Sequence, residues 1–567
     1  MNRNAWSSFR SFAGIVRRLL PGLAVMLMAG TGQANIINLT HPYTNTTIAA
    51  VIANAATVDG DVILVNTNVQ TENGIVVSKG VTLMGLGQNT TIVQGATARS
   101  NATDRIFNVL AGGGAGIWKS FTLSNMTIRY GYTTNDGAGL QVDYNNSPYW
   151  TTTVDRVTFT MNDQHAGIGS GGGAIVQNKW PSILIIRNSS FSSNTTSKAG
   201  GAIYLRGMGG MEISGSTFAQ NQAASGGGGL YMDYVTSGMT TIKNSTFAYN
   251  STPGSTGGGI YFGGRSAFTG AVYNCTFYSN SATYGGGIFI ENDIGTPGTV
   301  RLTSCLLASN SAPTAPELYI RSGVPTTISN CLAQGGIGGT GTYTDGGGNQ
   351  TNVNAKVLPL ADNGGPTLTC AIASDSPARD AGSNPLSLAA DQRGTGFTRT
   401  RGTVTDIGAF EYGASAVTYP GTFIEVYPFN SGAINNTANL LITIVGGETF
   451  TGTDCSQITN NVVVTNLPAG LTLSMIRTNN GTAALVALLG NAAQQAQSNT
   501  VTNLGFTFLD AAFTLGNASQ LGSYSVTNQT VQFYDAVAGG ALAYGARTSW
   551  RTPPGTMAVS PRRTRSP

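Results

Sequence analysis

Two short phrases alternate in the middle of the chain: Gly200-Gly-Ala-Ile-Tyr204, Phe218-Ala-Gln-Asn221, Gly227-Gly-Gly-Leu-Tyr231 and Phe247-Ala-Tyr-Asn250. The second phrase, an apolar residue followed three places later by Asn, begins at Phe159, Phe191, Phe218, Phe247, Phe277 and Leu307. These starting points are 32, 27, 29, 30 and 30 residues apart. A steady period of this length indicates a solenoid, in which each repeat buries its apolar side only against its neighbours.

The composition of each repeat decides which solenoid is formed. Every repeat has three or four short segments rich in Ile, Val, Thr and aromatic residues, separated by Gly, Asn and Ser. Helical repeats avoid glycine and need longer stretches with helical periodicity, whereas this pattern is typical of strands and turns. Roughly 27–30 residues at about 3.3 Å each suffice for a triangular coil of three short strands. The sequence therefore predicts an all-β protein built on a right-handed parallel β-helix.

Equivalent residues of successive coils should form columns. One set of asparagines is expected at a tight bend, in the left-handed conformation, with each amide bonded to the same residue one coil away: Asn125, Asn188, Asn244, Asn274 and Asn330. The asparagines of the FxxN phrases should form a second ladder, and the glycine clusters suit a corner with positive φ. Three cysteines, Cys275, Cys305 and Cys331, share one inward position. We expect free thiols there, because parallel Cβ vectors suit a disulfide poorly.

The alternating GGA-Ile/Leu and FxxN phrases resemble the passenger repeats of the polymorphic outer membrane proteins, a bacterial autotransporter adhesin family. This resemblance extends over about 150 residues. It implies a β-helix fold and a role in adhesion at the cell surface.

Residues 1–34 read as a secretory signal peptide. Four arginines precede a short apolar run, and the segment ends in Gly32-Gln-Ala34, a small-residue cleavage site. Without these four, the 29 basic residues fall to 25, equal to the 25 acidic residues. The mature chain is thus neutral, and it shows no basic face suited to nucleic acid. We expect an exported protein, extracellular or at the outer membrane or cell surface, with no transmembrane span once the leader is removed.

The remaining chain divides by composition. Residues 35–350 are assigned to the solenoid, 351–413 to a C-terminal cap, 414–418 to a linker, 419–535 to a smaller β-sandwich and 536–567 to a disordered basic tail. The segment 351–413 contains, in this order, Asn363-Gly-Gly-Pro-Thr367, Ser376-Pro-Ala-Arg-Asp-Ala-Gly382, Asp391-Gln-Arg-Gly394 and Asp406-Ile-Gly-Ala-Phe-Glu-Tyr412. This order of motifs is similar to the "choice-of-anchor Q" segment of bacterial β-helix proteins. This segment concentrates charge at Asp380, Asp391, Arg393, Asp406 and Glu411. We expect salt-bridged capping structure, with a cation site as the alternative.

An outward aromatic column is the predicted binding site. The residue after the apolar position of each glycine phrase should point away from the core, and these residues are Tyr204, Tyr231, Tyr261, Phe289 and Tyr319. Exposed rings along a groove suit sugar rings or an apolar partner. The alternative is self-stacking that stabilises the sheet and binds nothing.

Catalytic chemistry has few candidates. Asp233 and Glu291 occupy equivalent positions two coils apart, about 9.6 Å along the axis, which fits an inverting glycosidase pair. Asp163 and His165 are neighbours that suit acid–base chemistry. The more ordinary interpretation is surface polarity in both cases. No zinc spacing or Ser-His-Asp pattern is present in the sequence, so we expect neither a metal nor another cofactor.

The sequence thus favours a non-enzymatic, exported β-helix protein that binds a polysaccharide or a cell-surface partner. A polysaccharide lyase or glycoside hydrolase is the alternative, because parallel β-helices also carry such enzymes. A purely structural envelope component is the third hypothesis.

Overall fold

The computed structural model describes residues 35–535, with short gaps at 111–117, 143–148, 166, 168, 179–181, 208–209, 234–238, 265–268, 293–297, 402, 414, 420, 427–430, 439, 447, 515, 517 and 519–520. The predicted signal peptide (1–34) and the predicted tail (536–567) lie outside the described residues. In the described part of the chain, no helix is both long enough and apolar enough to cross a membrane.

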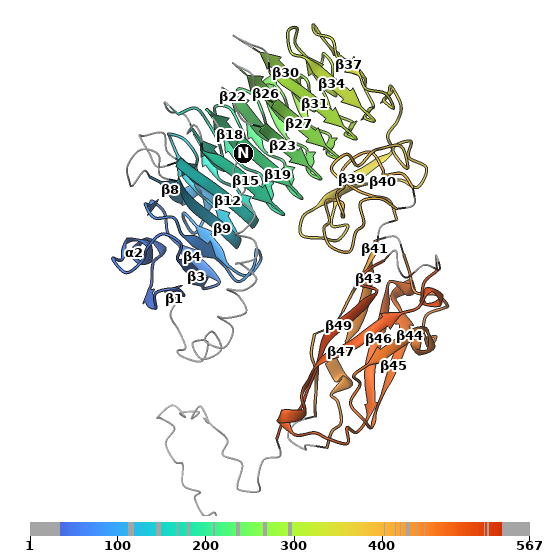
Figure 1. The fold of residues 1–567 in the computed structure, drawn as a ribbon. Coiled ribbons are helices and arrows are strands. Elements are labelled where there is room, and N and C mark those ends of the chain that lie inside the picture. Colours follow the sequence, from blue (N-terminus) through green and yellow to red (C-terminus); the bar gives the residue numbers. More distant parts are fainter. Residues whose placement is uncertain are drawn as a thin grey trace, which may run out of the picture.

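A parallel β-solenoid forms the first part of the chain, with strands of successive coils stacked in register (Figure 1). One regular coil consists of β19 (Gly210–Ser214), β20 (Thr217–Ala219), β21 (Gln222–Ala223) and β22 (Leu230–Asp233). β19 and β20 belong to the largest sheet, which bends between them, while β21 and β22 belong to two further sheets. The predicted coil with three sides is confirmed, and the bend gives it four strands.

The largest sheet has two columns of stacked strands, one on each side of this bend. The long strands β9 and β12 span the bend and belong to both columns. The first column contains β3 (Val62–Asn66), β6 (Thr82–Met84), β9 (Trp118–Arg129), β12 (Tyr149–Thr160), β15 (Ile183–Arg187), β19, β23 (Met239–Lys243), β27 (Thr269–Tyr273), β31 (Thr299–Thr303), β34 (Thr326–Ser329) and β37 (Thr344–Asp345). The second contains β4 (Val69–Thr71), β7 (Ile92–Gln94), β16 (Ser190–Ser192), β20, β24 (Thr246–Ala248), β28 (Thr276–Tyr278), β32 (Leu306–Ala308), β35 (Leu332–Ala333) and β38 (Gln350–Thr351).

The other two sheets complete the coil. The six-stranded sheet contains β10 (Tyr132–Thr133), β13 (Asp163–Gln164), β17 (Thr195–Thr196), β21, β25 (Ser251–Thr256) and β29 (Ser281–Tyr284). The ten-stranded sheet contains β5 (Ile75–Val77), β8 (Phe107–Val109), β11 (Leu140–Val142), β14 (Ile175–Gln177), β18 (Ile203–Arg206), β22, β26 (Ile260–Gly264), β30 (Ile288–Asn292), β33 (Leu318–Ile320) and β36 (Ile337–Gly339). Every pairing within these two sheets is parallel.

A short helix closes the N-terminal end, which the sequence did not predict. β1 (Asn35–Asn38) pairs antiparallel with β2 (Tyr43–Asn45) and β3, and α2 (Ile48–Ala53) follows. Ile48, Val51 and Ile52 of α2 are buried against the first coils. The carboxylate of Glu72 accepts hydrogen bonds from the backbone N–H groups of Ile48 and Ala49, each at 2.8 Å, and so satisfies the helix start.

Stacked phenylalanines fill the interior beside the second strand column. The rings of Phe159, Phe191, Phe218, Phe247 and Phe277 are fully buried, and successive ring centroids are 4.6–5.2 Å apart. Each ring therefore packs against its equivalents one coil away. This is the burial between repeats that a solenoid requires.

The FxxN asparagines form the predicted ladder. Asn194 donates from Nδ2 to Oδ1 of Asn221 at 2.9 Å, and Asn221 donates to Asn250 in the same way. The buried ladder runs from Asn162 to Asn310. It ends on a carboxylate, since Nδ2 of Asn310 lies 2.5 Å from Oε2 of Glu317.

The bend asparagines are only partly as predicted. Asn125, Asn188, Asn244, Asn274 and Asn330 have φ between 44° and 53°, which confirms the left-handed conformation. Their amides, however, form no ladder in the hydrogen bonds of the described residues. Asn244 and Asn274 donate instead to the backbone carbonyls of Ala390 and Ser383, because the segment after the solenoid packs against this bend.

The glycine corner and the cysteine column are confirmed. Gly227 has φ of 59°, and a Cβ on Gly228 would lie 2.4 Å from the carbonyl oxygen of Gly258 on the next coil. Only glycine fits where neighbouring backbones approach so closely. Cys275, Cys305 and Cys331 are buried free thiols, and burial raises the pKa of Cys275 to about 12.

Residues 351–413, predicted as a cap, lie along the side of the solenoid. They include β39 (Val357–Ala361) and β40 (Thr369–Ile372), an antiparallel pair (Figure 1). Gln392 accepts a hydrogen bond from Oγ1 of Thr246 at 2.5 Å, and the backbone N–H of Ala409 donates to Oγ1 of Thr276 at 2.9 Å. Outward hydroxyl groups of successive coils therefore hold this segment in place.

A β-sandwich follows the solenoid, as predicted. One sheet contains β41 (Ser415–Thr418), β43 (Leu441–Val445), β45 (Leu471–Thr478), β46 (Ala483–Gly490) and β48 (Leu521–Gly522). The other contains β42 (Phe423–Ile424), β44 (Val462–Thr465), β47 (Val501–Phe508) and β49 (Ser525–Gln532). The prediction of a linker at 414–418 is wrong for Ser415–Thr418. These residues form β41, which pairs with β43 and β48, and Ala416 and Val417 are buried.

Candidate functional site

The predicted aromatic column exists, but it is largely buried. Successive ring centroids from Tyr204 through Tyr231, Tyr261 and Phe289 to Tyr319 lie 5.4, 4.2, 5.6 and 5.0 Å apart, and the rings are stacked. Tyr204, Tyr261 and Phe289 are each only 5% exposed. The expectation of an exposed aromatic face is therefore wrong for these three rings, because each ring covers the faces of its neighbours.

The polar ends of these tyrosines are also engaged. The hydroxyl of Tyr261 donates to Oε1 of Glu291, and Arg321 pairs with the other carboxylate oxygen. Burial raises the pKa of Tyr204 to about 12 and also raises the pKa values of Tyr231 and Tyr261. The column is therefore a neutral, self-contacting structure at ordinary pH.

Asp233 and Glu291, the candidate pair for an inverting glycosidase, lie beside this column. Gly263 pairs with Glu291 in register, and Asp233 is one place beyond the pair of Met232 and Phe262. The predicted equivalence of the two acids is thus confirmed. The space between them is occupied, since Cε1 of Tyr261 would lie 2.5 Å from a Cβ on Gly263. Glu291 is 7% exposed and already holds Tyr261 and Arg321, so among the described residues its carboxylate contacts side-chain partners.

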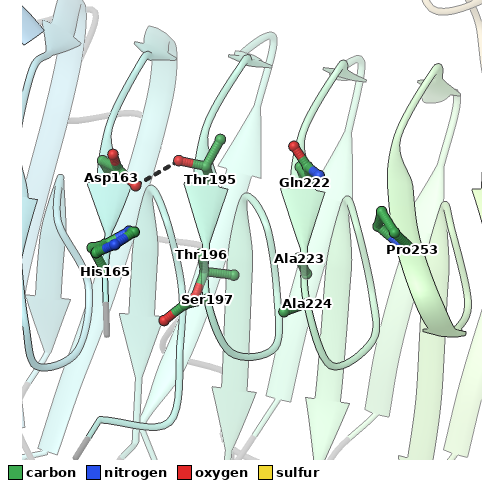
Figure 2. A pocket seen from close by; sticks show the side chains of 9 residues that line it. All are labelled: Asp163, His165, Thr195, Thr196, Ser197, Gln222, Ala223, Ala224 and Pro253. Carbon is green, nitrogen blue, oxygen red and sulfur yellow. Dashed lines mark hydrogen bonds between the residues drawn. The ribbon is translucent and has the colours of Figure 1, made fainter. Parts of the chain in front are cut away.

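A polar groove lies on the outer face of the six-stranded sheet. It consists of two hollows of about 410 Å³ and about 780 Å³ that share Asp163. Figure 2 shows Asp163, Thr195 and Gln222 side by side on successive coils of the first hollow. His165, Ser197 and Ala224 follow in a second row. We call this surface the polar groove.

Three side chains form a hydrogen-bonded centre where the two hollows meet. Oγ1 of Thr195 donates to Oδ1 of Asp163 at 2.6 Å, and Nη2 of Arg99 donates to Oγ1 of Thr195 at 2.7 Å. The guanidinium also lies 3.5 Å from Oδ2 of Asp163. The side chains of Arg99 and Asp163 remain 39% and 25% exposed, so both can contact a ligand in the groove.

The second hollow adds an aromatic ring and further hydroxyl groups. It is lined by Arg99, Ser100, Ala102, Thr103, Tyr132 and Asp163. Tyr132 precedes Asp163 in the same column, one coil earlier. The groove therefore combines charged, hydroxyl, amide and aromatic groups over several coils.

Sequence reasoning found part of this groove and missed the rest. Asp163 and His165 were singled out as neighbours, and the structure places both in the first hollow. Arg99 was missed, because it reaches Thr195 from 96 residues earlier in the chain and belongs to no repeated phrase. The outward positions of Thr195 and Gln222 after the FxxN asparagines were a usable signal.

The carboxylates of residues 351–413 form ion pairs, as predicted. Nη2 of Arg393 lies 2.6 Å from Oδ2 of Asp391, both fully buried, and Arg399 lies 3.7 Å from Glu411. Arg393 also stacks on the rings of Phe397 and Phe410. Burial raises the pKa of Glu411 to about 8 and also raises that of Asp406. The predicted ion pairing is therefore present at Asp391 and Glu411.

No group of three or more His, Cys, Asp or Glu side chains with metal-ligand geometry occurs among the residues that the structure describes. The polar groove itself offers hydrogen-bonding and ion-pairing groups.

Comparison with known proteins agrees with the fold. Residues 179–357 match the family model described as the right handed beta helix region. Searches of curated proteins and of solved structures each found no match. Together with the parallel sheets, the family model establishes a right-handed β-helix repeat protein, a class that includes both enzymes and non-enzymes.

Proposed function

We propose that this protein is a non-enzymatic adhesion protein, secreted or held at the cell surface, that binds a polysaccharide in the polar groove. The observation that carries the proposal is the pair of hollows joined at Asp163. Thr195 donates to the Asp163 carboxylate, and Arg99 donates to Thr195 and forms an ion pair with Asp163. Carbohydrate hydroxyl groups both donate and accept hydrogen bonds, and this groove offers both kinds of partner.

The direction of the groove suits a linear polymer. Asp163, Thr195 and Gln222 are register partners on successive strands, which lie about 4.8 Å apart in a parallel sheet. A chain running along the solenoid axis would meet a new polar side chain at every coil. Tyr132, in the same column one coil before Asp163, provides a ring face for a sugar.

Two sequence features support adhesion as the role of this binding. The GGA-Ile/Leu and FxxN phrases resemble those of the polymorphic outer membrane proteins, and residues 1–34 read as a signal peptide. The "choice-of-anchor Q"-like segment 351–413 is consistent with a surface protein. In this proposal the solenoid presents the groove and the sandwich is an accessory domain.

A glycan array probed with the full chain tests the proposal. Arg99→Gln should weaken binding of the selected glycan by about tenfold or more, because a hydrogen bond to a charged group contributes roughly 1.5–3 kcal/mol. Arg301→Gln is the matched control, since Arg301 is an exposed arginine of β31 on another sheet, and it should bind as the wild type does. A chain that binds no glycan, or equal losses in both variants, would contradict the proposal.

A polysaccharide-degrading enzyme is the second candidate, favoured by Asp163 and His165 in one hollow. Acid–base glycoside hydrolysis needs two carboxyl groups, and Asp163 is the one acid among the described residues that line the groove. A reducing-end assay on plant and algal polysaccharides distinguishes the candidates. Release of new reducing ends that disappears in Asp163→Asn would establish the enzyme and overturn the binding proposal.

A further inference from the structure

The closest pair in the aromatic column is Tyr231 and Tyr261. Their ring centroids are 4.2 Å apart with an angle of 6° between the ring planes. They are register partners on the adjacent parallel strands β22 and β26. The ring carbons of two tyrosines are thus held in van der Waals contact by the backbone of two neighbouring coils.

A proton acceptor stands at one end of this pair. The hydroxyl of Tyr261 donates to Oε1 of Glu291, whose other oxygen pairs with Arg321. Oxidation of a phenol by one electron is easiest when its proton has an acceptor in place, because the charged radical cation is then avoided. Tyr261 can pass its proton to Glu291, and Tyr231, which is partly exposed, can pass its proton to water.

The pair is also within reach of an oxidant. Tyr261 is 5% exposed, whereas Tyr231 is partly exposed. An electron can therefore leave from Tyr231 at the surface while the neighbouring ring stays protected. The Tyr231 radical can then take an electron from Tyr261 across the stack and a proton from water, while Glu291 takes the Tyr261 proton. A second oxidation of Tyr231 leaves both rings as radicals.

We propose that Tyr231 and Tyr261 are a site of oxidative dityrosine cross-linking by hydrogen peroxide and a haem peroxidase. Each phenol loses one electron and one proton, and the two radicals join through the ring carbons beside the hydroxyl groups. The hydrogens on those carbons then move to the oxygens, restoring both phenols. The two hydrogen atoms lost reduce one hydrogen peroxide to two water molecules. The product is a covalent bond between two coils of the solenoid.

Oxidation of the full chain followed by peptide mass mapping tests this site. The expected result is dityrosine fluorescence from the monomeric chain and a linked peptide pair containing Tyr231 and Tyr261, lighter by two hydrogens. Tyr261→Phe should abolish this link while keeping the stack, because Phe289 already occupies the next position of the column. Glu291→Gln should slow the link by about a hundredfold or more, the least that a positioned proton acceptor typically contributes.

Tyr249 and Tyr278 provide the matched control pair. They also touch across adjacent coils, but at 5.6 Å and edge to face, with Tyr249 36% exposed. If exposure alone governed the reaction, this pair would link first. A link at Tyr249 and Tyr278 without one at Tyr231 and Tyr261, or no dityrosine at all, would overturn the proposal.

Discussion

The outer faces of the ten-stranded and six-stranded sheets are built by the same rule and differ in outcome. Each places one outward side chain per coil in a column, for example Tyr231 on β22 and Gln222 on β21 of the same coil. On the first face, large flat side chains stack on one another and cover most of each other's surface. On the second, small polar side chains leave hollows between coils. Repetition thus creates a column, and side-chain size decides whether it remains open.

The largest loss of stability is expected when a ring is removed from the aromatic column of the ten-stranded sheet. Tyr261→Ala should lower the free energy of unfolding by about 3 kcal/mol or more, as truncation of a buried ring commonly does. Urea denaturation checks this value. A loss below about 1 kcal/mol would show that the stacked rings contribute little to stability and do not bury one another as the structure indicates.

The end of the asparagine ladder should respond to pH. Burial raises the folded-state pKa of Glu317 to about 7, above the 4.5 of a free glutamate side chain. Stability is therefore fully present below about pH 4.5 and is lost as pH rises through 7. Glu317→Gln should match the wild type at low pH and exceed it by up to about 3 kcal/mol above pH 7. Unfolding curves of both proteins below pH 4.5 and above pH 7 check this. An equal difference in stability between the variant and the wild type under both conditions would contradict it.

The ladder itself should show an intermediate effect. Asn250→Ala removes the acceptor of the backbone N–H and the side-chain amide of Asn221. Leaving buried donors unpaired costs about 2 kcal/mol, which thermal or urea unfolding would detect. Asn101→Ala, at an exposed position, is the control and should leave stability unchanged.

The smallest change in stability is expected in the polar groove. Gln222→Ala should change the free energy of unfolding by no more than about 0.5 kcal/mol, as exposed substitutions usually do, while weakening glycan binding. A large loss of stability in this variant would mean that Gln222 in the polar groove, like the rings of the aromatic column, contributes to the stability of the fold.

The repeat made much of the fold predictable. Phe218, Asn221 and Gly227 recur in equivalent positions, so their burial, ladder and positive φ followed from spacing alone. The stacking of the outward tyrosines followed from the same register. Their burial did not, since it depends on how tightly neighbouring rings close over one another.

Features outside the repeat were not predictable from the sequence. The helix α2 has only six residues, too few to show a helical period. The position of residues 351–413 depends on long-range contacts such as that between Thr246 and Gln392, 146 residues apart. Arg99 enters the polar groove in the same way. Local patterns carry no information about such pairs.

The most direct test of the account uses the two histidines of the chain, His41 and His165. His165 lines the polar groove, whereas His41 is exposed near the N-terminal end, paired with Asp61. Both should react with diethyl pyrocarbonate in the free protein. With the polysaccharide selected by the glycan array bound, the account predicts protection of His165 and unchanged modification of His41. Equal modification of His165 with and without the polysaccharide would contradict it.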